Sequence, residues 1–237
     1  MSRFRRYAVA TLTVLVAAVA IRLGIWQLDR LEARKGANAV LLEAREAEPL
    51  DLNREAPTAG HQATAMGEFD SGIRLLLRNR VSRQAPGVHV VSLFRTTGGA
   101  PVWVLRGFVP AADGVHPAVV PAPTSGEVTI SGELQPLPHT DDGGGPLVID
   151  GDTTWQRLDV EAAAGLAPEA APVILYLAGG EAGPGRLREV EPPILDNGPH
   201  LSYAFQWFAI ACASLAFGVL VLRTKPVPSD RGPVPPP

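Results

Sequence analysis

The stretch LSYAFQWFAIACASLAFGVLVL, residues 201–222, runs for 22 positions without a charged side chain. An α-helix of this length rises roughly 30 Å, which is the thickness of the hydrocarbon core of a bilayer. A second apolar run, residues 7–28, carries one charge, Arg22, near its outer end, where the side chain can snorkel toward the headgroups. Both runs are therefore predicted to be transmembrane helices in contact with the lipid bilayer.

Basic residues lie on the distal side of each run, and the positive-inside tendency then places both termini in the cytoplasm. These residues are Arg3, Arg5, Arg6, Arg223, Lys225 and Arg231. The predicted order is a cytoplasmic N-terminus (1–6), a first span (7–28), an extracytoplasmic domain (29–199), a second span (200–222) and a cytoplasmic tail (223–237). The tail is rich in proline and is predicted to be extended and disordered.

A cleaved signal peptide is the alternative interpretation of the first run. Ala18, Val19 and Ala20 form a possible small-residue cleavage site after the basic start. However, the apolar pattern continues beyond that site to Leu28, and Trp26 lies where an interfacial aromatic residue is expected. We therefore favour a retained membrane helix.

The overall composition excludes several classes of protein. The chain has 237 residues, of which 46% are hydrophobic and 19% charged, and its net charge is -3, so neither a disordered chain nor a nucleic-acid-binding protein is indicated. The single cysteine, Cys212, rules out an intramolecular disulfide and a multi-cysteine zinc site. The 24 glycines and 23 prolines favour a β protein rich in loops.

The region between the two spans is predicted to begin with a helix and to continue as a β domain. Residues 29–48 contain good helix formers and end at Pro49. Short β-compatible runs separated by turn residues then predict an extracytoplasmic antiparallel sheet or barrel. The expected strands cover residues 61–69, 73–80, 88–95, 101–109, 127–135, 146–150, 155–159, 172–177 and 186–190.

Local patterns refine this expectation. Thr96 to Gly99 is typical of a hairpin turn, and Asp141 to Gly145 of a flexible loop. Asp159 is the expected N-cap of a short helix that Gly165 ends. Alternation in the strand at 127–134 predicts one buried and one solvent-exposed face. The buried face carries Val128, Ile130 and Leu134, and the exposed face carries Glu127, Thr129 and Glu133.

The usual local signatures of catalysis are missing. The sequence contains no glycine-rich phosphate loop, no HExxH helix and no Gly-x-Ser-x-Gly elbow, so a hydrolase is not favoured. A membrane-tethered envelope hydrolase is the weakest of the functions considered. Four histidines are scattered without ligand spacing and are interpreted as structural or surface residues. They are His61, His89, His116 and His139.

His200 differs from these because it opens the second span, directly after Pro199. The positive end of the helix dipole disfavours an imidazolium there, so a neutral ring could ligate a metal such as haem iron. Tyr203 and Trp207 follow on the same stripe of the helix. An aromatic belt at headgroup level is the alternative, and the residues alone favour it. Small residues at Ser214 and Gly218, or at Ala209 and Ala213, offer a surface for helix packing.

Several motifs, taken in order, resemble the Surfeit locus protein 1 family of cytochrome c oxidase assembly factors, found in mitochondria and bacteria. The first span ends in Leu-Gly-Ile-Trp-Gln-Leu-Asp-Arg at 23–30, and a helix with Arg34 and Lys35 follows. The β region contributes Gly-Glu-Phe-Asp at 67–70, Arg-Asn-Arg at 78–80, Pro-Gly-Val at 86–88 and Val-Leu-Arg-Gly-Phe-Val-Pro at 104–110, where Phe108 replaces the usual Trp. The second span opens with His-Leu-Ser-Tyr-Ala-Phe-Gln-Trp-Phe at 200–208.

The resemblance implies a two-span protein with a β-rich outer domain that assists the maturation of an aa3-type cytochrome c oxidase, with haem a as a transient cofactor. It also implies that the protein is not an enzyme. It makes His200 the ligand of the haem iron, with Tyr203 and Trp207 beside the macrocycle, and this reverses the preference for a belt. It also implies that the motif residues Trp26, Gln27, Arg30, Arg106 and Gly107 serve structure or partner binding. The implied partners are the oxidase catalytic subunit and the haem a synthesis machinery. A bacterial cell membrane is favoured over the mitochondrial inner membrane, and a scaffold of the oxidase or respiratory supercomplex that does not bind haem is the alternative function.

Overall fold

The computed structural model describes residues 3–139, 145–149, 152–178 and 187–224. The chain divides into two compact units. The helical unit comprises residues 1–38 and 195–237, and the β unit comprises residues 39–194. Residues 225–237 of the predicted tail and most of the predicted loop at 141–145 lie outside the described residues.

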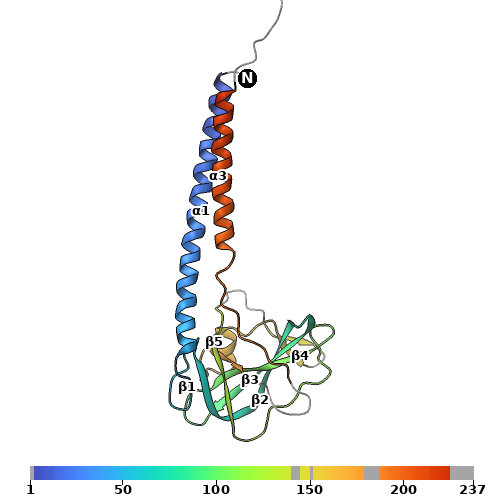
Figure 1. Cartoon of the computed structure of the whole chain (residues 1–237). Coiled ribbons are helices and arrows are strands. Elements are labelled where there is room, and N and C mark those ends of the chain that lie inside the picture. Colours follow the sequence, from blue (N-terminus) through green and yellow to red (C-terminus); the bar gives the residue numbers. More distant parts are fainter. Residues whose placement is uncertain (1–2, 140–144, 150–151, 179–186, 225–237) are drawn as a thin grey trace, which may run out of the picture. The chain divides into compact units, whose positions relative to one another are not determined.

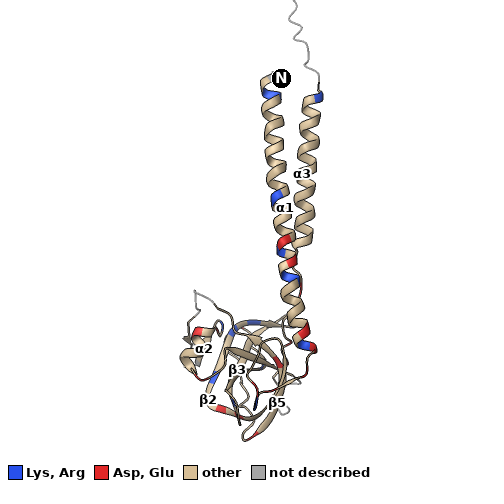
Figure 2. Cartoon of the chain, turned by 90° about the vertical axis from the view of Figure 1, so that its left-hand side faces the viewer, with Lys and Arg blue, Asp and Glu red and all other residues tan. Residues whose placement is uncertain are grey.

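Two long helices form the helical unit. Helix α1 (Arg3–Glu46) and helix α3 (His200–Arg223) lie side by side over the length of α3 (Figure 1). Both are long and apolar enough to cross a bilayer. In Figure 2 the two helices are almost free of charge except at their outer ends and in the later part of α1. Two apolar helices near the ends of the chain, as predicted, therefore flank a β domain.

Helix α1 is continuous through the predicted span at 7–28 and through the predicted helix at 29–48 as far as Glu46. The composition changes at Asp29, but nothing between Leu28 and Glu46 breaks the backbone hydrogen-bond pattern. Gly36 is accommodated inside the helix and has no neighbour within 4 Å of an added Cβ. The last residues of α1, 39–46, belong to the β unit.

Small residues bring the two helices together. The buried residues of α3 are Ala204, Ala211 and Gly218, each seven positions from the next. Ala211 packs with Ala17 and Ala20 of α1. Gly218 of the predicted Ser214 and Gly218 pair is buried in this seam, whereas Ala209 and Ala213 are exposed and do not pack against α1.

The close approach of the helices is visible at Gly24 of α1. A Cβ added to this residue would lie 2.7 Å from Cε1 of Phe208 on α3. Only a glycine leaves room for the phenylalanine ring at this separation. The helices of this unit therefore pack through interlocking small and large side chains, as expected where lipid supplies no hydrophobic driving force.

The described residues of the β unit form eight strands and one short helix, besides the last residues of α1. The strands are β1 (Leu50–Asp51), β2 (Gln62–Ser82), β3 (Ala85–Thr96), β4 (Val102–Pro110), β5 (Val128–Pro136), β6 (Leu147–Ile149), β7 (Asp152–Trp155) and β8 (Val173–Leu177), and the helix is α2 (Val160–Leu166).

Five of these strands close into a barrel. The pairings run from β2 to β3, β4, β8, β5 and back to β2. Strand β7 pairs with β2 outside this ring, and β6 pairs with β7. The predicted barrel is thus present, but an all-antiparallel arrangement is wrong, because β1 with β2, β2 with β7 and β4 with β8 pair in parallel. The long connections between these partners allow the second strand to return in the same direction.

The strand positions agree with the predicted ones in most places. Strand β2 covers two predicted strands, because its chain bends at a register shift between Phe69 and Arg74 without ending. The turn between β3 and β4 is confirmed, and the Thr96 hydroxyl accepts a hydrogen bond from the Gly99 amide at 3.0 Å. The strand predicted at 155–159 is wrong beyond Trp155, and at 186–190 the described residues form only the isolated bridge between Phe108 and Arg188.

The two largest hydrophobic clusters of the described residues hold the sheet. One cluster draws residues from all five strands of the ring and fills the barrel, with Phe94, Leu134 and Leu175 fully buried at its centre. The other contains Trp103 and extends to Ala163 of α2. Helix α2 therefore covers one part of the outer barrel surface.

Helix α2 begins where the sequence predicts. The Asp159 carboxylate accepts a hydrogen bond from the Ala162 amide at 2.8 Å, which confirms the N-cap. The predicted end at Gly165 is wrong, because the helix continues to Leu166 and is capped by Ala167, whose amide bonds the Ala163 carbonyl. Gly165 is therefore an ordinary helical residue rather than a terminator.

Glu133 contradicts the predicted solvent face of β5. Its side chain is buried, whereas Thr129 on the same face is exposed. Arg45, near the end of α1, covers it and donates a hydrogen bond from Nε to Glu133 Oε1 at 2.7 Å. The amide of Gln135 donates to the same oxygen at 2.6 Å. Residues distant in sequence thus bury and neutralise a carboxylate that the local alternation assigns to water.

Candidate functional site

The loop before α3 positions His200 at the first turn of that helix. Gly198 has a positive φ of 66°, which glycine adopts without strain, and its amide donates to Asp196 Oδ1 at 3.1 Å. The Asp196 carbonyl accepts hydrogen bonds from Asn38 Nδ2 at 2.8 Å and from Arg34 Nε at 3.3 Å. The start of α3 is therefore tied to α1 by several polar contacts within the helical unit.

The imidazole of His200 is held by Gln27 of α1. His200 Nδ1 lies 2.9 Å from Gln27 Oε1, and because this amide oxygen can only accept, Nδ1 is the protonated nitrogen. A neutral ring then keeps its lone pair on Nε2. Metal-ligating histidines characteristically donate their other ring N–H to a carboxylate or carbonyl oxygen. The donor set at His200 thus fits an axial haem ligand.

A cavity of about 360 Å³ lies beside this imidazole within the helical unit. The two arginines of its lining, Arg30 and Arg34, are four residues apart and therefore lie on one face of α1. The one carboxylate in the lining, Asp196, already accepts a hydrogen bond from the Gly198 amide. The lining residues are Arg30, Ala33, Arg34, Ala37, Asp196, Gly198 and His200. The cavity is therefore a positively charged space next to a possible metal ligand.

The other predicted aromatic residues are distributed differently. Trp26 and Tyr203 are both 45% exposed, and the Arg30 guanidinium lies 6.0 Å from the Trp26 ring centroid. Trp207 is partly buried and packs against the cluster that includes Ala211. The structure thus brings His200, Gln27 and Arg30 together, whereas Trp207 takes part in packing the two helices.

Arg106 and Gly107, which the motif resemblance also singled out, lie on β4 in the β unit. Arg106 is fully buried, and its two terminal nitrogens each donate to the Pro121 carbonyl at 3.3 Å. Gly107 has a φ of 154°, and an added Cβ would lie 2.6 Å from the Leu187 Cβ. Both residues therefore have evident structural roles in attaching loops to the barrel.

The remaining histidines do not form a metal site. Among the described residues no group of three or more histidine, cysteine, aspartate or glutamate side chains could hold a metal ion. His116 Nδ1 contacts the carboxylate of Asp113 at 2.5 Å within one surface turn. Burial, and secondarily the charge of Arg80, lowers the pKa of His89 to about 4.

Sequence reasoning missed Asn38. Its amide donates to the Asp196 carbonyl and to Asn197 Oδ1, the second at 3.2 Å, and its side chain is buried. A buried polar residue inside a helix of mostly charged and small side chains gives no periodic signal. Asn197 therefore has a structural role as a hydrogen-bond partner of Asn38.

These features define a class of protein. Two helices of membrane-spanning length near the chain ends flank a mixed-sheet β domain, and a histidine at the mouth of the second helix is oriented by the first. This is the organisation of a membrane protein with two spans and one β domain.

Comparison with known proteins supplies the family. The SURF1 family profile matches residues 14–212, and the chain therefore belongs to the SURF1 family. Uncharacterized SURF1-like proteins of Mycobacterium bovis and of two strains of Mycobacterium tuberculosis are each 28% identical to it over 208 residues, covering 82% of this chain and 72% of each relative. The family is associated with the assembly of cytochrome c oxidase and is a family of assembly factors rather than of enzymes.

Proposed function

We propose that this protein is a non-enzymatic assembly factor that binds haem a and delivers it to the catalytic subunit of an aa3-type cytochrome c oxidase. His200 holds the haem iron through Nε2. Bound haem a supplies the redox-active iron porphyrin that the oxidase needs, and the residues of this chain bind and orient it. Family membership supports the oxidase context, and the local geometry supports the ligand.

The observation that carries the proposal is the hydrogen bond from His200 Nδ1 to Gln27 Oε1 at 2.9 Å. It fixes the tautomer, restrains the ring and leaves the other nitrogen available. The partner lies on the neighbouring helix, so the bond restrains the imidazole in one orientation, as is characteristic of a metal ligand. The motif at the end of the first span and the motif at the start of the second therefore contribute to one haem-binding site.

The cavity beside His200 supports a role for two further residues. Haem a carries carboxylates on one edge, and Arg30 and Arg34 offer two guanidinium groups in the same cavity lining. Tyr203 is exposed and provides an aromatic surface along the helix. Trp207 completes the stripe and also packs the two helices. These residues would orient the macrocycle while His200 holds its iron.

The same proposal includes location and partners. The chain spans a bacterial cell membrane twice, with both termini in the cytoplasm and the β unit outside it, and it exchanges haem with the synthesis machinery and the oxidase catalytic subunit. Arg6 donates a hydrogen bond from Nε to the Val221 carbonyl at 3.2 Å, so basic residues gather at one end of the helix pair. That clustering supports a cytoplasmic position for this end.

The test is co-expression with the haem a synthesis enzymes, followed by purification in detergent and measurement of haem a per chain from the absorption spectrum. We expect the wild type to retain haem a and His200→Ala to lose it. His139→Ala is the matched control, because His139 is an exposed imidazole of the β unit. It should retain wild-type haem content.

Two outcomes would contradict the proposal. Equal haem content in the wild type and His200→Ala would remove His200 as the ligand. A wild-type chain that binds no haem a, yet still retains the oxidase catalytic subunit in a pull-down, would instead indicate a scaffold. Circular dichroism of each variant checks that both helices and the β unit remain folded.

A further inference from the structure

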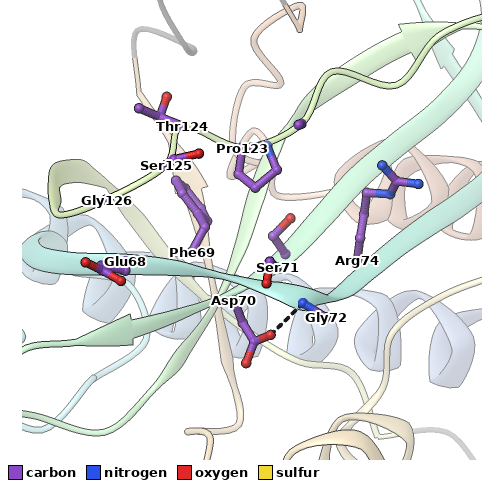
Figure 3. A pocket seen from close by; sticks show the side chains of 12 residues that line it. Glu68, Phe69, Asp70, Ser71, Gly72, Arg74, Pro123, Thr124, Ser125 and Gly126 are labelled. Atoms are coloured by element: carbon purple, nitrogen blue, oxygen red, sulfur yellow. Dashed lines mark hydrogen bonds between the residues drawn. The ribbon is translucent and has the colours of Figure 1, made fainter.

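The β unit contains a cavity of about 580 Å³ where β2 bends. One wall is β2 around the register shift between Phe69 and Arg74, and the opposite wall is the segment 122–126 (Figure 3). A volume of this size is typical of small-molecule sites. The lining residues are Glu68, Phe69, Asp70, Ser71, Gly72, Arg74, Ser92, Ala122, Pro123, Thr124, Ser125 and Gly126.

Arg74 and Ser92 are two polar residues of the cavity lining. They are direct cross-strand partners on β2 and β3, so their side chains project from the same face of the sheet. Arg74 is exposed and makes no hydrogen bond or ion pair with any described residue. Ser92 is only 1% exposed, and its hydroxyl has no hydrogen-bond partner within the described part of the chain.

An unsatisfied buried hydroxyl is unusual, because a buried polar group without a partner has lost its hydrogen bonds to water and gained none in exchange. Ser92 lines the cavity, and its cross-strand partner Arg74 has no counter-ion among the described residues. A ligand that accepts a hydrogen bond and carries a negative charge would satisfy both groups at once.

The two carboxylates of the lining do not oppose this charge. Strand alternation places Glu68 and Asp70 on the face opposite to Phe69. Figure 3 shows Phe69 and Arg74 on the side of the Pro123 segment, whereas Asp70 points the other way. Asp70 accepts hydrogen bonds from the Gly72 amide and from Arg95 Nε, each at 2.8 Å, and these hold the pKa of its carboxyl below the usual range.

The face that Arg74 shares with Phe69 also offers apolar contact. The ring of Phe69 and the pyrrolidine of Pro123 line the cavity from opposite walls. The covering segment is anchored just before Pro123, because the Pro121 carbonyl accepts two hydrogen bonds from buried Arg106. The hydroxyls of Thr124 and Ser125 complete a preformed wall.

We propose that this cavity binds a small organic anion. Its carboxylate or phosphate pairs with the Arg74 guanidinium and accepts a hydrogen bond from Ser92 Oγ, while its apolar part lies between Phe69 and Pro123. This site belongs to the β unit and does not depend on haem binding at His200. It gives the β domain a ligand of its own.

The test is a titration of the full-length chain in detergent micelles, with isotope-labelled glycine followed by nuclear magnetic resonance. Gly72 and Gly126 line the cavity and report binding. The probes are benzoate, phenyl phosphate and the neutral analogue benzamide. Both anions should shift the two glycine signals saturably, and benzamide should bind at least about 10-fold more weakly.

Variants localise the effect. Arg74→Gln should weaken binding of both anions about 10-fold and Ser92→Ala about 3-fold. Arg83→Gln is the matched control, because Arg83 is also an exposed arginine of the β unit but lies outside this cavity, and it should change affinity less than about 2-fold.

Several results would overturn the proposal. These are the absence of a shift with either anion, equal binding of benzamide, or wild-type affinity in Arg74→Gln. Shifts produced by an acidic peptide but by neither small anion would also overturn it, since the site would then recognise a protein partner. The unliganded spectrum of each variant shows whether the barrel remains folded, and Ser92→Thr retains the hydroxyl if Ser92→Ala does not fold.

Discussion

Replacing Gln27 tests whether the neighbouring helix prepares the imidazole of His200 for its ligand. Gln27→Met keeps the length and approximate volume of the side chain but removes the oxygen that accepts from His200 Nδ1. Gln27→Glu keeps an acceptor and adds negative charge. The two variants therefore separate the hydrogen bond from the packing at one position.

The expected magnitude follows from the geometry. The 2.9 Å bond from Nδ1 to Oε1 is the one hydrogen bond of the His200 ring within the described residues, and it is partly buried. Loss of an outer partner of a metal-ligating histidine typically weakens metal binding about 10- to 100-fold, or about 1.4–2.7 kcal/mol. Because this bond is neutral and only partly buried, we expect the lower end, about 10-fold, for Gln27→Met.

Gln27→Glu should behave in the opposite direction. A carboxylate that accepts from Nδ1 increases the electron density at Nε2 and makes the imidazole a stronger donor. We therefore expect haem affinity at or above the wild-type value. The iron–histidine stretching frequency, measured by resonance Raman spectroscopy, should rise in Gln27→Glu and fall in Gln27→Met.

The assay is an absorbance titration of purified, haem-free chain in detergent with haem, for the wild type and both variants. Unchanged affinity and an unchanged Raman spectrum in Gln27→Met would refute the reasoning, since the ring would then need no partner on α1. Helical circular dichroism of each variant excludes a loss of the helix pair as the cause of weaker binding.

Three further predictions concern other parts of the molecule. The double variant Arg30→Gln/Arg34→Gln should bind haem about 10-fold more weakly than the wild type. It should bind haem dimethyl ester as the wild type does, because the ester lacks the carboxylates that the guanidinium groups contact. Equal losses of affinity for both ligands would contradict this role. Burial depresses the pKa of His89 from 6.5 to about 4, so the unfolded chain binds more protons than the folded chain between these pH values. The free energy of unfolding of the β unit should therefore be highest above pH 6.5 and should fall by at most about 3 kcal/mol as the pH drops to 4. Thermal melts of the wild type and His89→Gln across this range measure it, and an identical pH slope would count against it. Gly107→Ala should destabilise the β unit by about 2–3 kcal/mol, because its Cβ would lie 2.6 Å from that of Leu187 at a φ of 154°; a denaturant midpoint like that of the wild type would show that the loop yields freely.

The helices were predictable because their signal is a simple absence of charge. Residues 201–222 need no tertiary information to indicate a helix of membrane length. The continuity of α1 was less evident, since a change of composition at Asp29 resembles a boundary although the backbone pattern does not change. The composition of a helix indicates whether it lies in lipid or in water, whereas only helix-breaking residues indicate where it ends.

The β unit shows where local reasoning stops. Alternation correctly buried Ile130 and Leu134, but it placed Glu133 in water because Arg45, which covers it, is distant in sequence. The parallel pairing of β4 with β8 likewise depends on long connections and has no local pattern. Side-chain period identifies a strand, whereas strand direction is decided by the whole topology.

The candidate site was predictable in part for the same reasons. His200 stands out because a helix begins there after a proline. Its contact with Gln27 joins residues at opposite ends of the chain, so spacing could not reveal it. Trp207 shares the stripe of His200, but its ring also packs the two helices, a use that depends on the neighbouring alanines.

The seven-residue spacing of Ala204, Ala211 and Gly218 leaves the seam between the helices almost the same at each repeat. A shift of α3 along α1 by two helical turns would preserve such a seam. Contacts that occur only once must therefore set the axial alignment of the two helices. The pairing of His200 with Gln27 is one of them. The hydrogen bond that orients the imidazole therefore also sets the axial alignment of α1 and α3. A ligand bound to that ring would stabilise the two helices in this one alignment.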